Sequence, residues 1–243
     1  MTDVLPGDRW LIRPEPRMTL DVCAVADSHP DFVPDLVFAD PPYGQRRFIN
    51  RFSRRPGDGR GAKAGEPLQS DIIGDEDGEL AAQALTAMLD AHPDALHIWW
   101  GANLYEVPLI SPSWLVWDKT GGGKVVNDNA CAELAWTTRG GPTRIFTHLW
   151  KGMCRASEPA RSHKRVHPTQ KPVALARWCI ETYPKRQVES VFEPFAGAAP
   201  AAVAAWDLGL RYHGVELDAG YASAALSRLD NRGARPELVR RAG

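Results

Sequence analysis

The stretch VESVFEPFAGAAPAAVAAWDLGLRYHGVELDAGYASAALSRL, residues 188–229, decides the fold. Its segments 188–192 and 212–215 have the length and the apolar or aromatic content of buried strands. Segments 200–208 and 221–229 predict helices, the first of them opened by a proline. Strand, turn, helix and strand in this spacing form a βαβ unit. The stretch therefore predicts an α/β fold with a doubly wound, mostly parallel sheet.

The same stretch contains two features with which such a sheet binds a ligand at the ends of its strands. The turn Glu193–Gly197 follows the first strand, where a tight turn lets the backbone approach the ligand. Glu216 ends the second strand, where a carboxylate can accept hydrogen bonds from ribose hydroxyls. We therefore expect a ligand site at this edge of the sheet.

A second informative stretch, LVFADPPY, occupies residues 36–43. It places Asp40 and Tyr43 directly after a probable buried strand, with a rigid pair of prolines between them. The carboxylate can accept a hydrogen bond from an exocyclic amino group, and the aromatic ring can stack on a base that has left its helix. An ordinary turn after a strand is the structural alternative for these four residues.

The two stretches together resemble the β-type amino-group DNA methyltransferases, which methylate adenine N6 or cytosine N4. HPTQKPVALARWCI, from residue 167, joins the resemblance, and CAELAWTT (131–138) and RIFTHLWKGM (144–153) look like the middle of phage and prophage members. The catalytic loop comes first, target recognition next and the cofactor site last, which is the permuted motif order of that family. The resemblance covers residues 18–231.

This resemblance implies a Rossmann-like methyltransferase fold, S-adenosylmethionine as cofactor and duplex DNA with a flipped base as partner. The catalytic positions that it implies are Asp40, Pro41, Pro42 and Tyr43. The cofactor-binding positions that it implies are Glu193, Pro194, Phe195, Gly197, Ala199 and Glu216, with Thr169, Gln170 and Lys171 closing the pocket from the other side. A homodimer is expected from the family alone.

The chain departs from the family at Ala198, Ala199 and Pro200, where a small hydroxyl residue, a glycine and a threonine are usual. An alanine restricts positive φ and places a methyl group near the ligand, and Ala198 removes a hydroxyl. Pro200 suits a helix start. This departure keeps a second hypothesis open, a non-catalytic DNA-binding protein derived from such an enzyme.

The remaining segments predict one methyltransferase domain over residues 1–243, with the region 45–165 supplying most of the target recognition. Further strands are predicted at 18–24, 35–39, 95–100, 114–117, 132–137 and 144–148, and further helices at 78–91 and 172–183. The segment 44–70 has neither a helical nor a strand period, which predicts a long surface loop.

Charge is strongly segregated along the chain, although the formal net charge is only −1. Basic residues cluster after the Asp-Pro-Pro-Tyr motif and again between 151 and 171. The candidate DNA-binding residues are Arg46, Arg47, Arg51, Arg54, Arg55, Lys164 and Arg165. A solvated loop explains the first cluster equally well.

The four cysteines lack CxxC spacing and no secretory segment precedes them, so we expect no disulfide framework, no metal site and a cytoplasmic location. No apolar run approaches the roughly 18 residues needed to span a bilayer. The motif Asp-Pro-Pro-Tyr leans towards adenine N6 by resemblance. Cytosine N4 of DNA, RNA and a modified base stay open as substrates.

Overall fold

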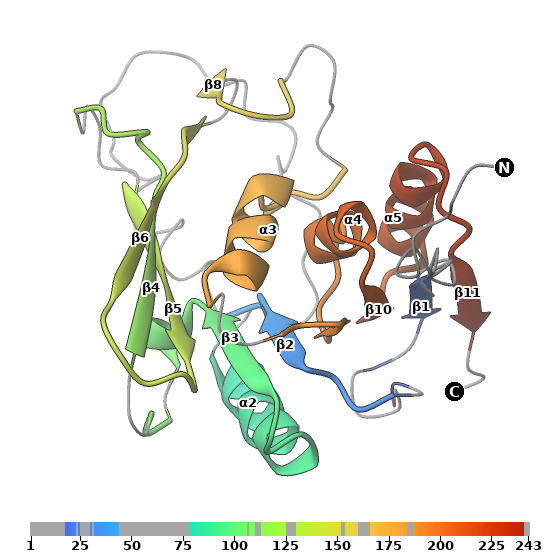
Figure 1. Cartoon of the computed structure of the whole chain (residues 1–243), viewed down its shortest axis with the longest axis horizontal. Coiled ribbons are helices and arrows are strands. Elements are labelled where there is room, and N and C mark those ends of the chain that lie inside the picture. Colours follow the sequence, from blue (N-terminus) through green and yellow to red (C-terminus); the bar gives the residue numbers. More distant parts are fainter. Residues whose placement is uncertain are drawn as a thin grey trace, which may run out of the picture.

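The computed structural model describes residues 18–22, 24, 30, 32–43, 78–105, 107–109, 113–124, 130–151, 154–159, 166–183 and 187–240. A nine-stranded sheet with the order β11-β1-β10-β9-β2-β3-β5-β4-β6 forms its centre (Figure 1). Its strands are β1 (Met18–Val22), β2 (Leu36–Ala39), β3 (Leu96–Trp100), β4 (Ser113–Asp118), β5 (Ala132–Thr137), β6 (Arg144–Thr147), β9 (Ser190–Glu193), β10 (Arg211–Val215) and β11 (Glu237–Arg240).

Strand β5 is antiparallel to both of its neighbours, β3 and β4, whereas the other pairs of this sheet are parallel. The prediction of a doubly wound, mostly parallel sheet is therefore confirmed. A hairpin of β7 (Trp150–Lys151) and β8 (Cys154–Arg155) lies outside the sheet. The sequence analysis missed this hairpin and β11, because strands of two to four residues show little periodicity.

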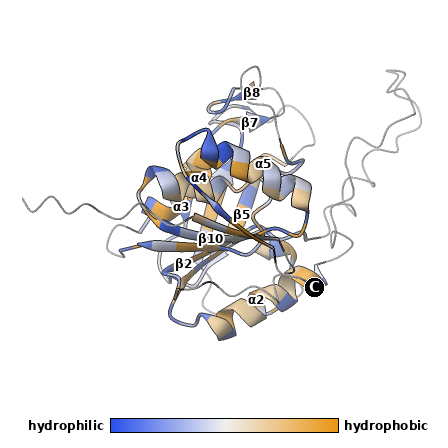
Figure 2. Cartoon of the chain, turned by 90° about the vertical axis from the view of Figure 1, so that its right-hand side faces the viewer, coloured by the Kyte–Doolittle hydropathy of each residue, from blue (hydrophilic) through white to orange (hydrophobic). Residues whose placement is uncertain are grey.

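Helices cover both faces of the sheet. Helices α3 (Val173–Glu181), α4 (Pro200–Asp207) and α5 (Ala219–Asp230) lie on one face, and α2 (Glu79–Ala91) lies on the other (Figures 1 and 2). In both views the hairpin β7–β8 lies beyond the three-helix layer. A short 3-10 helix, η2 (Ala102–Leu104), follows β3.

The helix starts follow from local chemistry. Pro200 occupies the first turn of α4, where its missing N–H costs nothing, as predicted. Helix α5 begins two residues before the predicted start because Asp218 caps it. The Asp218 carboxylate accepts hydrogen bonds from the backbone N–H groups of Gly220 and Tyr221, at 2.7 and 2.9 Å.

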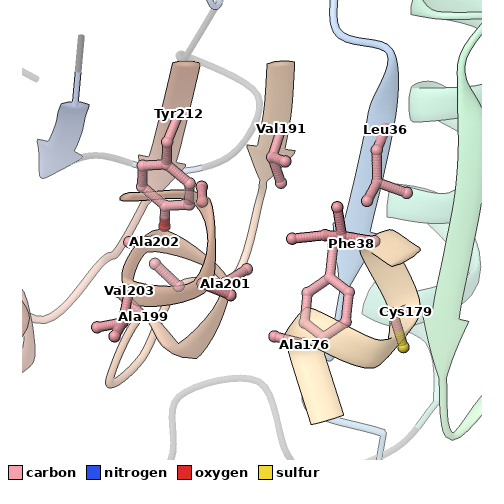
Figure 3. Packing of buried hydrophobic residues seen from close by; sticks show 14 of the residues in the cluster. Leu36, Phe38, Ala176, Cys179, Val191, Ala199, Ala201, Ala202, Val203 and Tyr212 are labelled. Atoms are coloured by element: carbon pink, nitrogen blue, oxygen red, sulfur yellow. The ribbon is translucent and has the colours of Figure 1, made fainter. Parts of the chain in front are cut away.

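Strand β2 shows how the sheet separates two hydrophobic clusters. Leu36 and Phe38 pack into the cluster under α3 and α4, whereas Val37 and Ala39 pack into the cluster under α2. All four side chains are fully buried. Figure 3 shows Phe38 pointing towards Ala176 of α3. The continuous apolar run is thus explained by burial on both faces.

Strands β2 and β9 are neighbours at the point where the strand order reverses, and Asp35 ties their beginnings together. Its Oδ2 accepts hydrogen bonds from the Oγ of Ser190 at 2.8 Å and from the backbone N–H groups of Glu189 and Ser190, each at 3.0 Å. The parallel register pairs Leu36 with Val191. Both strands therefore end at the same edge, which is where doubly wound sheets bind ligands.

Candidate active site

The Asp-Pro-Pro-Tyr motif begins at the residue after β2, and its tyrosine is packed on a glycine. Tyr43 is 7% exposed. Its ring covers Gly101, where an added Cβ would lie 2.4 Å from Tyr43 Cε1 and where φ is +75°. Tyr105 flanks the Tyr43 ring, with 6.4 Å between the two ring centroids. The Tyr105 hydroxyl donates a hydrogen bond to the Trp100 carbonyl at 2.7 Å. Gly101 is thus required by both space and conformation.

Four charged side chains from four segments meet beside this motif. The Nζ of Lys171 lies 2.8 Å from Asp40 Oδ2 and 3.0 Å from Glu133 Oε2. The Nζ of Lys119 lies 2.7 Å from Glu133 Oε1. Together, Asp40, Lys171, Glu133 and Lys119 form what we call the charged cluster. Its two positive and two negative charges balance.

Among the described residues, one oxygen of the charged cluster has neither a hydrogen bond nor an ion pair. Asp40 Oδ1 is buried and makes no hydrogen bond within the part of the chain that the structure describes. A buried carboxylate oxygen without a donor is destabilising, and such atoms are concentrated where a ligand supplies the missing group. Asp40 is therefore prepared to accept one hydrogen bond from a molecule that is not part of the fold.

Burial and charge compete in setting the pKa values of this cluster. Burial raises the pKa of Asp40, and Lys171 only partly counteracts it. Burial also pushes the pKa of Glu133 upwards, but attraction to Lys171 and Lys119 outweighs it and holds the pKa at about 2. Burial disfavours the charged form of Lys171, yet its two carboxylate partners raise its pKa overall. Glu133 and Lys171 are therefore firmly ionised.

The turn after β9 is held by its own backbone and by Glu216. The Glu216 Oε2 accepts a hydrogen bond from the Gly197 N–H at 2.7 Å, and its Oε1 accepts one from the Asp218 N–H at 2.8 Å. Phe195 and Gly197 are partly exposed, between residues that are buried. This turn brings an aromatic ring, a glycine backbone and a carboxylate to the same strand edge as Asp40.

Ala199 adopts the left-handed conformation that a glycine would adopt more readily, with φ +48° and ψ +56°. The strain is of the order of 1–2 kcal/mol for an L-residue. Its methyl group is not directed into an open cleft, because Ala199 is 1% exposed and packs in the cluster with Tyr212 and α4 (Figure 3). The expected obstruction of the ligand by this methyl group is therefore not what the structure shows.

Glu193 is 1% exposed and is engaged beneath the turn. Its Oε2 accepts a hydrogen bond from the Tyr212 hydroxyl at 2.6 Å, and the backbone of Ala201 donates to it as well. Burial raises its pKa well above the usual range, more than these bonds lower it. Its predicted contact with a cofactor stays a prediction, and in this structure Glu193 supports the start of α4.

The segment 166–171 connects the two strand exits. At one end His167 lies against Gly197 and meets the ring of Tyr221 edge-on, with 4.3 Å between centroids. At the other end Lys171 reaches Asp40. Gln170 fixes the segment between them: its Oε1 accepts a hydrogen bond from the Val166 N–H at 3.1 Å, and its carbonyl accepts one from Trp150 Nε1 at 3.2 Å.

Comparison with known proteins agrees with this geometry. Residues 114–227 match the family model for N6 and N4 methyltransferases, described as DNA methylase. This match covers just under half of the chain and makes the chain similar to the DNA methylases. A curated relative, the candidate methylase YubD of Escherichia coli (strain K12), is 41% identical over 68 residues. That alignment covers 28% of this chain and 30% of the relative, so the chain spans less than a third of it.

Solved structures share the fold of this chain. The complex named M1.HpyAVI-SAM has a TM-score of 0.51 at 14% identity and covers 87% of this chain and 98% of its own. The second structure is a selenomethionine derivative of TTHA0409, a candidate DNA modification methylase from Thermus thermophilus. It has a TM-score of 0.50 at 15% identity, and the alignment covers 92% of this chain and 99% of TTHA0409. The fold is thus the Rossmann-like fold of the S-adenosylmethionine-dependent methyltransferases.

The structure brings most predicted site residues to one edge of the sheet, where Lys171 pairs with Asp40. The expected role of Lys171 at the cofactor stays a prediction. The predicted DNA-binding residues Arg46, Arg47, Arg51, Arg54, Arg55, Lys164 and Arg165 lie outside the described residues. Within the described ranges, no three His, Cys, Asp or Glu side chains form a metal cluster, and no helix is long and apolar enough to cross a membrane.

Sequence reasoning missed Glu133 and Lys119 as site residues, and it did not select Gly101 or His167. Glu133 stands inside a predicted strand, where an acidic residue between apolar neighbours was the available signal. His167 begins the HPTQKP string, so the string itself pointed to it. Gly101 follows the strand β3, but only the packed ring of Tyr43 reveals why a glycine is needed there.

Proposed function

We propose that this protein is an S-adenosylmethionine-dependent DNA methyltransferase that acts on the exocyclic amino group of a flipped base, namely N6 of adenine. The observation that carries the proposal is the buried Oδ1 of Asp40, which has no partner in the described structure. It lies at the exit of β2, beside the strand whose exit carries the turn at Gly197. An amino group of a base has the donor that this oxygen lacks.

The residues at the β9 edge fit S-adenosylmethionine. Glu216 is a half-buried carboxylate at the end of β10, where ribose hydroxyls are bound in such sheets. The partly exposed Phe195 offers a ring edge or face to an adenine, and Gly197 allows close backbone approach with φ +50°. Ala199 forms the turn despite its methyl group, which favours a working cofactor site over the non-catalytic alternative.

The chemistry asks the protein mainly to position two reactants. S-adenosylmethionine would supply a methyl group from a positively charged sulfur, which leaves as a neutral thioether. The methylated nitrogen then gives up one N–H proton to water. The amino nitrogen is a poor nucleophile because its lone pair is delocalised into the ring. Hydrogen bonds from this amino group to the Asp40 carboxylate and the Pro41 carbonyl favour the pyramidal nitrogen, and Tyr43 holds the ring by stacking.

The choice of adenine over cytosine rests on the Asp-Pro-Pro-Tyr sequence, since the family model covers both N6 and N4 methylation. The region 45–165 and the basic residues that flank the motif are proposed to contact duplex DNA and to offset the few kcal/mol needed to flip a base. Cytosine N4 is the second candidate, because the same buried acceptor fits its amino group.

The experiment is transfer of labelled methyl groups from S-adenosylmethionine to duplex DNA, single-stranded DNA and RNA, followed by mass spectrometry of the digested nucleosides. N6-methyladenine from DNA is the expected product. If the product is N4-methylcytosine instead, the target base is cytosine and not adenine. No methylated nucleoside from any of the three, with folded protein and measured cofactor binding, would overturn the proposed activity.

A further inference from the structure

Lys171 is a buried cation shared by two carboxylates that come from distant parts of the chain. It is 5% exposed. Its ammonium group pairs with Asp40 at the exit of β2 and with Glu133 near the start of β5. A buried ion pair is expensive to desolvate and is a weak device for stability alone. Such a cluster at a reactive carboxylate therefore calls for a functional explanation.

We propose that Lys171, held in place by Glu133 and Lys119, is the positioning residue that occupies Oδ2 of Asp40 and leaves Oδ1 alone to accept the target amino group. This inference rests on the proposed function and deepens it. Lys171 does not touch the reacting atoms and acts through Asp40.

The geometry fixes Lys171 from several directions. Glu133 holds its ammonium group at 3.0 Å, and the other oxygen of Glu133 is held by Lys119 at 2.7 Å. Its backbone is fixed between Gln170, whose carbonyl accepts from Trp150, and Pro172, the cap of α3. The lysine therefore has little freedom, and the Asp40 carboxylate that it grips cannot rotate to bring both oxygens to the substrate.

The position of Lys171 also decides the charge that Asp40 carries. Burial alone favours the protonated acid, whose hydroxyl would no longer be a pure acceptor. Lys171 opposes this effect directly, whereas Glu133 repels the Asp40 charge. Among the described residues, the other groups that interact electrostatically with Asp40 are Lys119, Tyr105 and Glu193. Burial and the Asp40 charge together raise the pKa of Tyr105 well above its usual range. Burial, with a smaller contribution from the Asp40 charge, also raises the pKa of Glu193.

Removing the two partners should therefore move the pKa of Asp40 in opposite directions. Lys171→Met keeps the length of the side chain and removes the cation, which raises the pKa of Asp40. Glu133→Gln removes the repelling carboxylate, which lowers it. A cluster that served only to hold the fold together would show loss of stability in both variants without this opposed pair of shifts.

The test is a carbon-13 carboxyl titration of Asp40 in the full chain, assigned with Asp40→Asn and measured in wild type, Lys171→Met and Glu133→Gln. Lys124→Met is the matched control, because Lys124 is exposed and lies outside the cluster. Relative to wild type, we expect the pKa of Asp40 to rise in Lys171→Met, to fall in Glu133→Gln and to stay unchanged in Lys124→Met. An Asp40 pKa that is the same in wild type and Lys171→Met would overturn the proposal. If Lys171→Met does not fold, Lys171→Met/Glu133→Gln restores the charge balance, and Glu133→Gln alone still tests the sign.

Kinetics then separate positioning from cofactor binding. Lys171→Met should lower kcat by at least about tenfold, as expected when a positioned group is lost, and move its acid limb to higher pH. The affinity for S-adenosylmethionine, measured by calorimetry, should change less than twofold, and Lys171→Arg should recover part of kcat. Weakened cofactor binding with unchanged kcat would overturn the inference in favour of a cofactor contact. If the wild type transfers no methyl group, the proposed function is overturned. The titration still tests whether Lys171 sets the pKa of Asp40, because it does not depend on activity.

Discussion

The two strand exits that meet at the candidate active site are held in different ways. At the end of β2, Asp40 is fixed by an ion pair with Lys171, which also pairs with Glu133 of β5. At the end of β9, the turn is fixed by hydrogen bonds of its backbone, one of them to the Glu216 carboxylate, and by small buried side chains such as Ala199. The difference teaches that the first exit depends on ion pairs and the second on backbone hydrogen bonds and packing. Substitutions should separate these dependencies.

The largest effect should come from Asp40→Ala, which removes the acceptor and leaves the cofactor turn untouched. We expect methyl transfer to fall by roughly a thousand-fold or more, because a positioned hydrogen bond is lost at the reacting nitrogen. Cofactor affinity should stay nearly constant. The measurement is the initial rate of labelled methyl transfer, with Asp230→Ala on the exposed end of α5 as the control. Undiminished transfer would remove Asp40 from the catalytic role.

Gly101, beneath the Asp-Pro-Pro-Tyr motif, tests the contribution of shape at the β2 exit. Gly101→Ala should lower the free energy of unfolding by about 2–4 kcal/mol, from left-handed strain plus overlap with Tyr43. The measurement is urea unfolding, together with kcat.

Gly209→Ala is the matched control for Gly101→Ala, because Gly209 also has positive φ but has open space around its Cβ position. That variant should lose only about 1 kcal/mol. Equal losses at the two positions would mean that the packing of Tyr43 on Gly101 contributes little, and would leave charge as the sole determinant of this exit.

The locally determined part of the fold was predictable from the sequence. Residues 188–229 contain their own strand and helix periods, and α4 begins at Pro200 as expected. The direction of β5 was not predictable, because it depends on the path of the chain between β4 and β5 rather than on local periodicity. Its antiparallel pairing brings Glu133 to the edge of the sheet where Asp40 lies.

The candidate site was predictable only where its residues are consecutive. Asp40 and Tyr43 were found because they stand in one motif. Lys171 was placed at the cofactor by resemblance, whereas its ion pairs join positions 40, 133 and 171, which no sequence period relates. The strain at Ala199 was foreseen, but burial of its methyl group depends on how α4 packs.

A smaller effect is expected beneath the cofactor turn, where Tyr212 supports Glu193. Tyr212→Phe removes a 2.6 Å hydrogen bond and should cost about 1–3 kcal/mol, because a buried carboxyl oxygen loses its donor. The pKa of Glu193, already raised by burial, should rise further. A carboxyl group with a raised folded pKa contributes stability that is lost as the pH rises through that pKa, so the loss should be larger at about pH 8 than at about pH 5.

Urea unfolding at both pH values measures this effect. Glu193→Gln is the control, because it keeps an acceptor for the Tyr212 hydroxyl and does not titrate. In that background the effect of Tyr212→Phe should no longer depend on pH. A pH-dependent loss that persists in the Glu193→Gln background would show that another group is responsible.

The smallest effect should come from Ala199→Gly, which restores the residue usual in the family. It relieves strain of about 1–2 kcal/mol but removes a buried methyl group and adds freedom to the unfolded chain, so stability should change by less than about 1 kcal/mol. Because the Ala199 methyl group is 1% exposed, the affinity for S-adenosylmethionine should change less than about threefold in calorimetry.

Gly197→Ala is the opposite substitution in the same turn, at a partly exposed residue with φ +50°, and should weaken the binding of S-adenosylmethionine. If Ala199→Gly instead created an affinity that the wild type lacks, the alanine would be a true defect of the site. The β2 exit with its charged cluster would then be intact, whereas the β9 exit would have lost its function in cofactor binding.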